Sequence, residues 1–232
     1  MDGKAHLNRG GWKQDPDRVR SDILAVARTE FAANGLSGAR IDEIAAKTST
    51  SKRMIYYYFG DKESLYRRAL EAAYEEVRSG EQALELDHLE PVEALKQLVA
   101  FTFEHHSKHP DFIRMVMIEN IHNGAFMSKS DQIQRLNAGA IQKLELICRR
   151  GRDAGLFRDD ISALELHWHI SATSFFNVSN RATFSQIFGP SLFEAEGQDS
   201  IKRHMIEMVL TLALKPAHPR LSALLPSGLG RQ

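Results

Sequence analysis

The chain lacks several features that would assign it to particular classes of protein. Its 232 residues include a single cysteine, Cys148, so no internal disulfide can form, and this cysteine usage fits the reducing cytoplasm. No apolar run approaches the roughly 18 residues that a membrane-spanning helix needs. Residues 1–15 are too polar to supply the apolar stretch of a signal peptide. We therefore expect a cytoplasmic protein with no membrane partner.

Catalytic and cofactor signatures are missing as well. The chain has no nucleotide-binding glycine loop, nucleophile elbow, paired-carboxylate arrangement or carboxylate–histidine zinc motif. Its ten histidines include His105 and His109, which stand four residues apart and could share a helix face, but no cysteine pairs with them. The sequence predicts that the protein is not an enzyme and has no cofactor and no metal site; a metal site at these histidines is the weaker alternative.

Strand-like alternation of useful length is absent, whereas apolar residues recur at helical spacing along most of the chain. This pattern predicts an all-α fold. The net charge is zero, but residues 1–70 carry 13 Lys and Arg against 9 Asp and Glu, a formal charge of +4. The excess is small, so the positions of these basic residues say more about a nucleic-acid partner than their number does.

Start and stop signals divide the helical pattern into elements and domains. A first helix is expected to begin at Pro16 and to end at Asn34 and Gly35. Later helices are expected at 61–86, from Pro91, from Pro110, at 130–154, at 162–184 and at 199–214. The expected domains are a flexible arm (1–15), a helix-turn-helix domain (16–62), a larger helical body (63–215) and a flexible tail (216–232). The arm could be a plain tail or could reach into a DNA minor groove.

The most informative part of the chain is residues 40–59. Ile41 and Ile44 lie on one face of a short helix, which residues 48–50, two threonines and a serine, then interrupt. The side chains of such residues compete for backbone hydrogen bonds and favour turns. Ser51 can cap a second short helix. Two helices joined by so short a turn form a helix-turn-helix, whose second helix lies in the DNA major groove.

This stretch, with the segments Ile55-Tyr56-Tyr57-Tyr58-Phe59 and Lys62-Glu63-Ser64-Leu65-Tyr66, closely resembles the N-terminal signature of the TetR family of bacterial transcription regulators. The resemblance runs from about Arg18 to Leu70. It implies an all-helical homodimer with a three-helix DNA-binding head and a ligand-sensing helical body. One departure is that the family's turn carries glycine and then valine where this chain has Ser49 and Thr50. Ser49 would therefore be strained if that position required a positive φ.

The resemblance places DNA contacts at the start of the second helix and just beyond it. Arg53 could bind guanine O6 and N7 with two hydrogen bonds, and Tyr56 and Lys62 match the family's phosphate-binding tyrosine and lysine. The candidate DNA-binding residues are Arg40, Ser51, Lys52, Arg53, Met54, Tyr56, Tyr57 and Lys62. Tyr58 and Phe59 are expected in the core instead.

In the body, the helix expected at 162–184 is apolar on more than one face, as in a large core or a subunit interface. The resemblance implies dimerisation through the last two long helices, near 162–184 and 199–214. An apolar pocket with a few polar groups is expected to hold a small-molecule effector. The candidate ligand-binding residues are Phe101, His105, Arg114, Met117, Asn120, Trp168, Phe175 and Phe176.

These observations predict a ligand-responsive transcriptional regulator, most simply a repressor. It would bind a palindromic double-stranded DNA operator as a homodimer and be released by a small-molecule effector. The alternative is a DNA-binding protein of the same fold with a non-transcriptional role, such as coupling chromosome occupancy to cell division.

Overall fold

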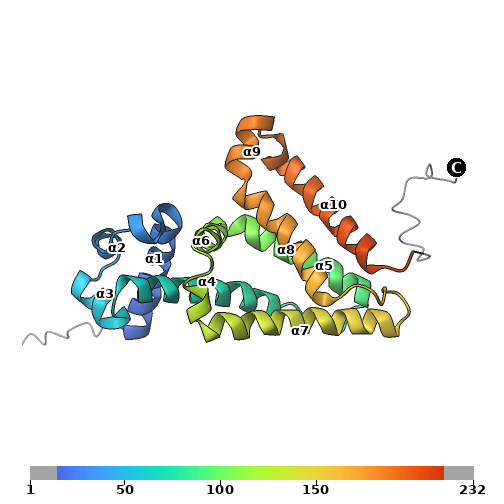
Figure 1. Ribbon diagram of the computed structural model, residues 1–232, viewed down its shortest axis with the longest axis horizontal. Helices are drawn as coiled ribbons and strands as arrows, with labels where there is room; N and C mark the ends of the chain where they lie inside the picture. The colour runs from blue at the N-terminus through green and yellow to red at the C-terminus, as the bar shows by residue number, and fades with distance from the viewer. Residues whose placement is uncertain (1–14, 217–232) are drawn as a thin grey trace, which may run out of the picture. The chain divides into compact units, whose positions relative to one another are not determined.

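The computed structural model describes residues 15–216, which form a succession of helices (Figure 1). They are α1 (Pro16–Gly38), α2 (Ile41–Lys47), α3 (Lys52–Phe59), α4 (Lys62–Gln82), α5 (Pro91–Lys108), α6 (Pro110–Ile121), α7 (Asp131–Asp153), α8 (Ala163–Ser179), α9 (Arg181–Phe188) and α10 (Ala195–Ala213), with short 3₁₀ turns η1 (Met127–Lys129) and η2 (Ser191–Phe193). The expected all-α fold is confirmed. Across these described residues, no helix has both the length and the apolar character needed to cross a membrane.

By their packing, the residues divide into two compact units between Ala69 and Leu70, inside α4. The predicted arm and tail lie outside the described residues, except for their innermost residues, 15 and 216.

The first unit is built on the buried stripe of α1. Ile23, Ala27 and Phe31 are fully buried there, and the Phe31 ring meets the edge of Tyr66 at a centroid distance of 5.1 Å. Pro16 stands at the start of α1, where a missing N–H costs no helical hydrogen bond. Gly35 interrupts the regular helix with φ of 66°, a backbone conformation that glycine adopts without strain. The predicted end at this glycine is thus a break, after which the chain makes one more short turn.

A buried carboxylate holds α2 against α1. Glu30 on α1 accepts hydrogen bonds from Lys47 Nζ at 3.0 Å and from Asn34 Nδ2 at 2.9 Å. The backbone N–H of Arg40 also donates to it. Lys47 and Arg40 lie at opposite ends of α2. The hydrogen bond from Lys47, more than any other contact, lowers the pKa of the Glu30 carboxyl, so the ionised form is the one that positions α2.

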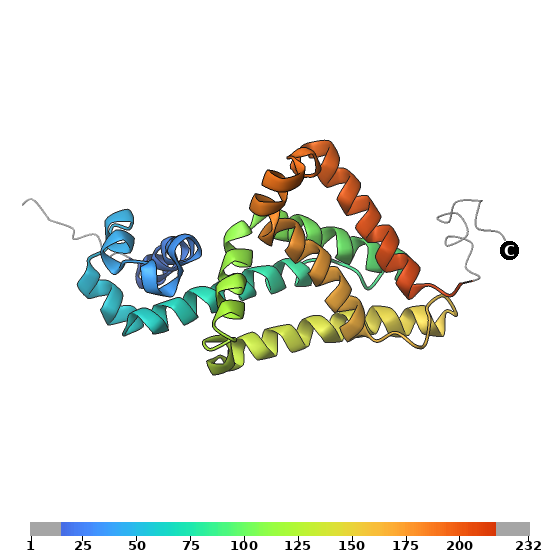
Figure 2. The same ribbon diagram turned by 45° about the horizontal axis from the view of Figure 1, so that its top comes forward.

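The second unit packs α5 between α7, α8 and α10. Its continuous core includes Leu95 and Val99 of α5, Leu166 of α8 and Val209 of α10. Figures 1 and 2 both show α9 at the end where α8 turns into α10.

Two helix boundaries differ from those expected. α4 ends at Gln82 rather than near residue 86, because Lys143 of α7 donates to the carbonyls of Glu81 (2.5 Å) and Leu84 (3.0 Å) and satisfies the end of the helix. The helix expected at 162–184 divides at Asn180 into α8 and α9. The Asn180 side chain and carbonyl bond to neighbouring hydroxyl groups, which compete with the helical pattern.

Two further expectations concerned one helix start and one single position. The last helix, α10, begins at Ala195 rather than near residue 199. In the described part of the chain, Asn123 alone among non-glycine residues has a positive φ. The backbone at Ser49 is therefore not strained, and the turn of the helix-turn-helix tolerates serine.

Candidate nucleic-acid interface and ligand cavity

The short helix α3 is fixed at both ends by local contacts. The Ser51 side chain accepts a hydrogen bond from Met54 N at 3.3 Å, as an N-cap residue does. At the other end Gly60, with φ of 80°, donates its N–H to the carbonyl of Tyr56 at 2.8 Å. Ile55 is the one fully buried residue of this helix. A single buried anchor leaves most of the surface of α3 facing outward.

The outward surface of α3 carries both charge and large aromatic groups. Lys52 and Arg53 are exposed, and Tyr57 is 77% exposed. Met54 and Tyr56 are partly exposed, at 37% and 40%. Cations that reach phosphate or guanine, beside apolar groups that fit sugars and thymine methyls, are the residue types used to contact duplex DNA.

Tyr58 and Phe59, which were expected in the core, are only half-buried. The guanidinium of Arg20 lies 5.2 Å above the Tyr58 ring. The prediction is therefore corrected: Tyr58 lies against Arg20 of α1, Phe59 contacts Tyr58, and neither ring fills the core, because Ile55 already occupies the inward position of α3.

The predicted phosphate-binding cations have different partners. Lys52 Nζ lies 3.0 Å from Asp42 Oδ1 on α2, and Lys62 Nζ donates to the carbonyl of Ser37 at 3.3 Å. Arg53 makes no hydrogen bond or ion pair within residues 15–216. Arg40 precedes α2 without a side-chain cap, and its side chain is exposed. An exposed pair such as Lys52–Asp42 is worth only about 0–1 kcal/mol, so DNA phosphate could displace it easily.

The second unit contains a cavity of about 450 Å³ bordered by five helices. Its walls come from α4, α5, α6, α7 and α8. The lining residues are Tyr74, Arg78, His106, Phe112, Ile113, Val116, Asn120, Asn137, His167, Trp168, Ser171, Ala172 and Phe175. Apolar and aromatic walls with a few polar groups are typical of sites for small organic ligands.

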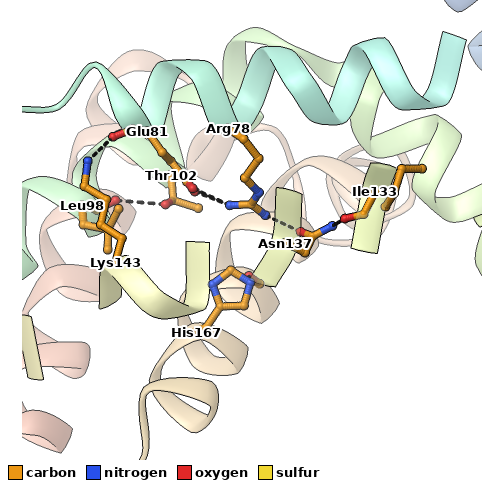
Figure 3. Close-up of polar contacts among 9 residues, drawn as sticks. Arg78, Glu81, Leu98, Thr102, Ile133, Asn137, Lys143 and His167 are labelled. Atoms are coloured by element: carbon orange, nitrogen blue, oxygen red, sulfur yellow. Dashed lines mark hydrogen bonds and ion pairs between the residues drawn. The ribbon is translucent and has the colours of Figure 1, made fainter. Parts of the chain in front are cut away.

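A buried arginine provides the strongest polar group of this cavity (Figure 3). Arg78 Nη1 lies 2.5 Å from both carboxylate oxygens of Glu81, and Nη2 donates to Asn137 Oδ1 at 2.8 Å. Asn137 Nδ2 in turn donates to the carbonyl of Ile133 at 2.8 Å. Because Glu81 balances the charge of Arg78, the pair can remain buried. The amide of Asn137 is held in one orientation by its two bonds.

Two histidines beside Arg78 are kept neutral. Burial, reinforced by the nearby positive charge of Arg78, lowers the pKa of His167 to about 4. Burial also lowers the pKa of His106 to about 3, with contributions from His105 and Arg78. His167 Nε2 lies 3.3 Å from Ser171 Oγ, whereas the buried His106 Nδ1 has no hydrogen-bond partner within the described residues. A neutral imidazole can donate and accept, so these rings can bind a polar ligand.

The structure brings some of the predicted ligand-binding residues together and separates others. Asn120, Trp168 and Phe175 line the cavity. Arg114 and Met117 instead line a second hollow of about 710 Å³, together with residues of α8 and α9.

The remaining three candidates line neither hollow. The Phe101 ring covers Gly80, where even a Cβ atom would lie 2.7 Å from the ring. His105 is buried and stacks on His109. Phe176 is 51% exposed.

Sequence reasoning missed the polar side of the cavity, formed by Tyr74, Arg78, Asn137 and His167. A signal was present in α4, where Tyr74, Arg78 and Glu81 follow one another at helical spacing beside the buried Val77. An opposite-charge pair on an apolar stripe indicates a buried ion pair rather than a solvated one. Burial also raises the pKa of Tyr74 to about 12, so its hydroxyl remains a donor at neutral pH.

Large apolar side chains are exposed along α8, α9 and α10. On α8, Leu164, Trp168 and Phe176 are 64%, 65% and 51% exposed. Ile187 and Phe188 of α9 are 70% and 68% exposed. Exposed apolar residues grouped on neighbouring elements indicate a surface that another molecule covers.

Comparison with known proteins gives consistent matches over both units. The family described as "Bacterial regulatory proteins, tetR family" matches residues 23–69, and the one described as "Tetracyclin repressor-like, C-terminal domain" matches residues 91–209. The chain is 35% identical to the HTH-type transcriptional repressor NicS of Pseudomonas putida, over 87% of this chain and 93% of that protein. It is 29% identical to the HTH-type transcriptional repressor SCO4008 of Streptomyces coelicolor, over 66% and 74% respectively.

Solved structures share the fold. A TetR family transcription regulator from Marinobacter aquaeolei VT8 superposes with a TM-score of 0.67 at 19% identity, covering 86% of this chain and 97% of that one. The putative transcriptional regulator SCO4942 from Streptomyces coelicolor gives a TM-score of 0.61 at 24% identity, over 84% and 98%. At these identities the likeness concerns architecture alone.

Proposed function

This chain belongs to the tetR family of bacterial regulatory proteins, and we propose that it is a repressor that binds a palindromic operator as a homodimer and leaves it when a small molecule fills the cavity beside Arg78. Family membership makes the chain a DNA-binding regulator rather than an enzyme. Relatives named as transcriptional repressors favour repression over activation.

The exposed surface of α3 is the observation that carries the DNA-binding part. Arg53 at the start of this helix is free of partners within the described residues, and Tyr57 is largely exposed. Ser51 caps the helix, so the backbone at its N-terminus is already ordered before DNA arrives. We assign base contact to Arg53, and phosphate contact to Lys52, Tyr56 and Lys62. Arg40 and Met54 would complete the contact surface.

A homodimer through α8 and α10 is supported by the apolar residues exposed there. Leu164 and Trp168 of α8 are exposed to about the same degree, 64% and 65%, and Met208 of α10 is 39% exposed. In a two-fold symmetric interface each protomer contributes its own copy of a residue, so three such side chains bury six apolar groups. Dimerisation would also supply two heads, which a palindromic operator requires at about 34–36 Å spacing.

The effector part rests on the cavity beside Arg78. Its volume of about 450 Å³ suits a small organic molecule, and its aromatic wall includes Trp168 and Phe175. Asn120, Asn137 and the neutral His106 and His167 offer hydrogen bonds, which fix orientation and select the ligand. Because Glu81 already balances Arg78, we expect an uncharged effector with hydrogen-bonding groups.

The proposal is tested by mapping where the protein binds in the genome of its host and by identifying any small molecule that co-purifies with it. A repressor should occupy one or a few promoters, and the bound molecule should release the protein from those sites in a gel-shift assay. Sites scattered along the chromosome outside promoters would favour a role in chromosome occupancy instead. Binding to DNA without sequence preference would contradict both.

A further inference from the structure

A histidine and carboxylate cluster adjoins the cavity without lining it: the His105 ring contacts His106 and Phe112, which do line it. Glu76 belongs to α4, His105 to α5, and His109 is the residue between α5 and α6. Each offers one ligand atom, and these three atoms all lie within 4.8 Å of one another. His109 Nδ1 is 3.3 Å from Glu76 Oε1.

The backbone holds the two histidines in register. His109 N donates to the carbonyl of His105 at 3.0 Å, which continues the helical spacing to the last residue before Pro110. His109 has φ of −122° and ψ of 63°, outside the regular helix, as expected for a residue before proline. The imidazole rings lie nearly parallel, with centroids 4.2 Å apart and 20° between their planes. The two rings are therefore side by side before any ligand binds.

We infer that Glu76, His105 and His109 form a binding site for a divalent transition-metal ion such as Zn²⁺. Two imidazole nitrogens and one carboxylate oxygen are a donor set that zinc accepts, with a water molecule or small ligand in the fourth position. Tetrahedral zinc holds its donor atoms about 3.3 Å apart, which the His109–Glu76 pair already matches. For His105 to complete the site, its ring must turn out of the stack on His109. Mg²⁺ and Ca²⁺ prefer sites made of oxygen alone and should be rejected.

The sequence makes a metal site the weaker alternative, because no cysteine accompanies these histidines and no carboxylate–histidine zinc motif is present. The structure supplies the missing donor from a different helix, since Glu76 is brought to them by the packing of α4 in the second unit. A bound ion would cross-link α4 to the junction of α5 and α6. This binding goes beyond the proposed function, because it holds whether or not the protein responds to an organic effector.

The test uses untagged full-length protein freed of metal with a chelator. Calorimetric titration with Zn²⁺ should give one ion per chain, and Co²⁺ in its place should give the visible absorption of a tetrahedral complex. Glu76→Gln and His109→Gln should each weaken Zn²⁺ binding tenfold or more. His122→Gln removes an exposed histidine outside the cluster and should leave the affinity unchanged.

Two results would overturn the inference. Absence of stoichiometric Zn²⁺ binding would leave a simple His109–Glu76 ion pair, and equal affinity in the wild type and both cluster variants would assign the metal to other residues. Because Glu76 is 41% exposed in its side chain, Glu76→Gln should fold even if a histidine variant does not. Operator binding by the metal-free protein, measured in parallel, tests the proposed function separately.

Discussion

The proposed roles of Arg53 and Lys62 are two kinds of DNA contact, one that selects sequence and one that does not. Arg53→Ala should remove a base contact and weaken operator binding about tenfold or more, with little change on unrelated DNA. Lys62→Ala should weaken binding to the operator and to unrelated DNA alike. It should also lower the slope of log affinity against log salt by about one unit. Fluorescence anisotropy over a range of salt concentrations separates the two effects. Small, equal effects of both changes would contradict the assignment of α3 as the reading helix.

His167 connects the stability of the second unit to pH. Its pKa is lowered from 6.5 to about 4, chiefly by burial, so the folded protein binds its proton more weakly than the unfolded chain does. The stability contributed by the neutral ring is therefore complete above pH 6.5 and is lost as the pH falls toward 4. The loss is at most about 1.4 kcal/mol per pH unit for one group.

Urea unfolding at pH 7.5, 6 and 5 and one fixed protein concentration measures this dependence. His106 has a lowered pKa as well and acts in the same direction, so the comparison with His167→Gln isolates one ring. The wild type should lose more stability on acidification than the variant. Parallel losses in the two proteins would show that His167 is not the group responsible.

Among the helices, α7 offers a clear test of packing. Gly151 lies against the buried Phe157, and a Cβ at this position would be 2.3 Å from Phe157 Cδ2. Gly151→Ala should lower the free energy of unfolding by roughly 1–3 kcal/mol, because the ring must move within a filled core. Gly139→Ala on the same helix meets nothing within 4 Å and should stabilise by up to about 1 kcal/mol. A stable Gly151→Ala protein would mean that Phe157 repacks freely.

The exposed face of α8 gives a prediction about assembly. Leu164→Glu should raise the dimer dissociation constant at least tenfold, because a two-fold interface would bury two unpaired charges. The monomer should still fold, since Leu164 is 64% exposed and lies in the first turn of α8, where acidic residues are favourable. Leu146→Glu, on the exposed side of α7, serves as the control and should dimerise normally. Analytical ultracentrifugation decides, and a wild-type monomer would contradict the proposed dimer.

Helix starts were more predictable from sequence than helix ends. Ser51 and Ser162 act through contacts within three residues of themselves, so the caps they form are visible in the sequence. The end of α4 depends instead on Lys143, far along the chain in α7. The same contrast holds for the sites. The candidate DNA contacts lie close together in sequence, whereas the polar side of the cavity joins Arg78 to Asn137, which only the folded chain brings together.

In the whole molecule, α4 is the element shared by the two units. Leu65 and Tyr66 are fully buried in the first unit, and Tyr74 and Arg78 line the cavity of the second. An effector that contacts Tyr74 and Arg78 therefore acts directly on the helix that continues from the head. To lower operator affinity a hundredfold, it must favour the non-binding state by about 2.7 kcal/mol, which is ordinary for allosteric coupling.

Thermodynamic linkage makes this coupling measurable from either side. If the effector lowers the operator affinity a hundredfold, saturating operator must lower the effector affinity by the same factor, because the two orders of binding connect the same four states. Calorimetry of the identified effector, with free protein and with operator-bound protein, gives the two constants. His167→Gln should reduce effector affinity without a direct effect on operator affinity, since His167 lines the cavity from α8, in the second unit and outside the DNA-binding head. Equal effector affinity for free and operator-bound protein would rule out induction through the cavity and would make the protein a constitutive regulator.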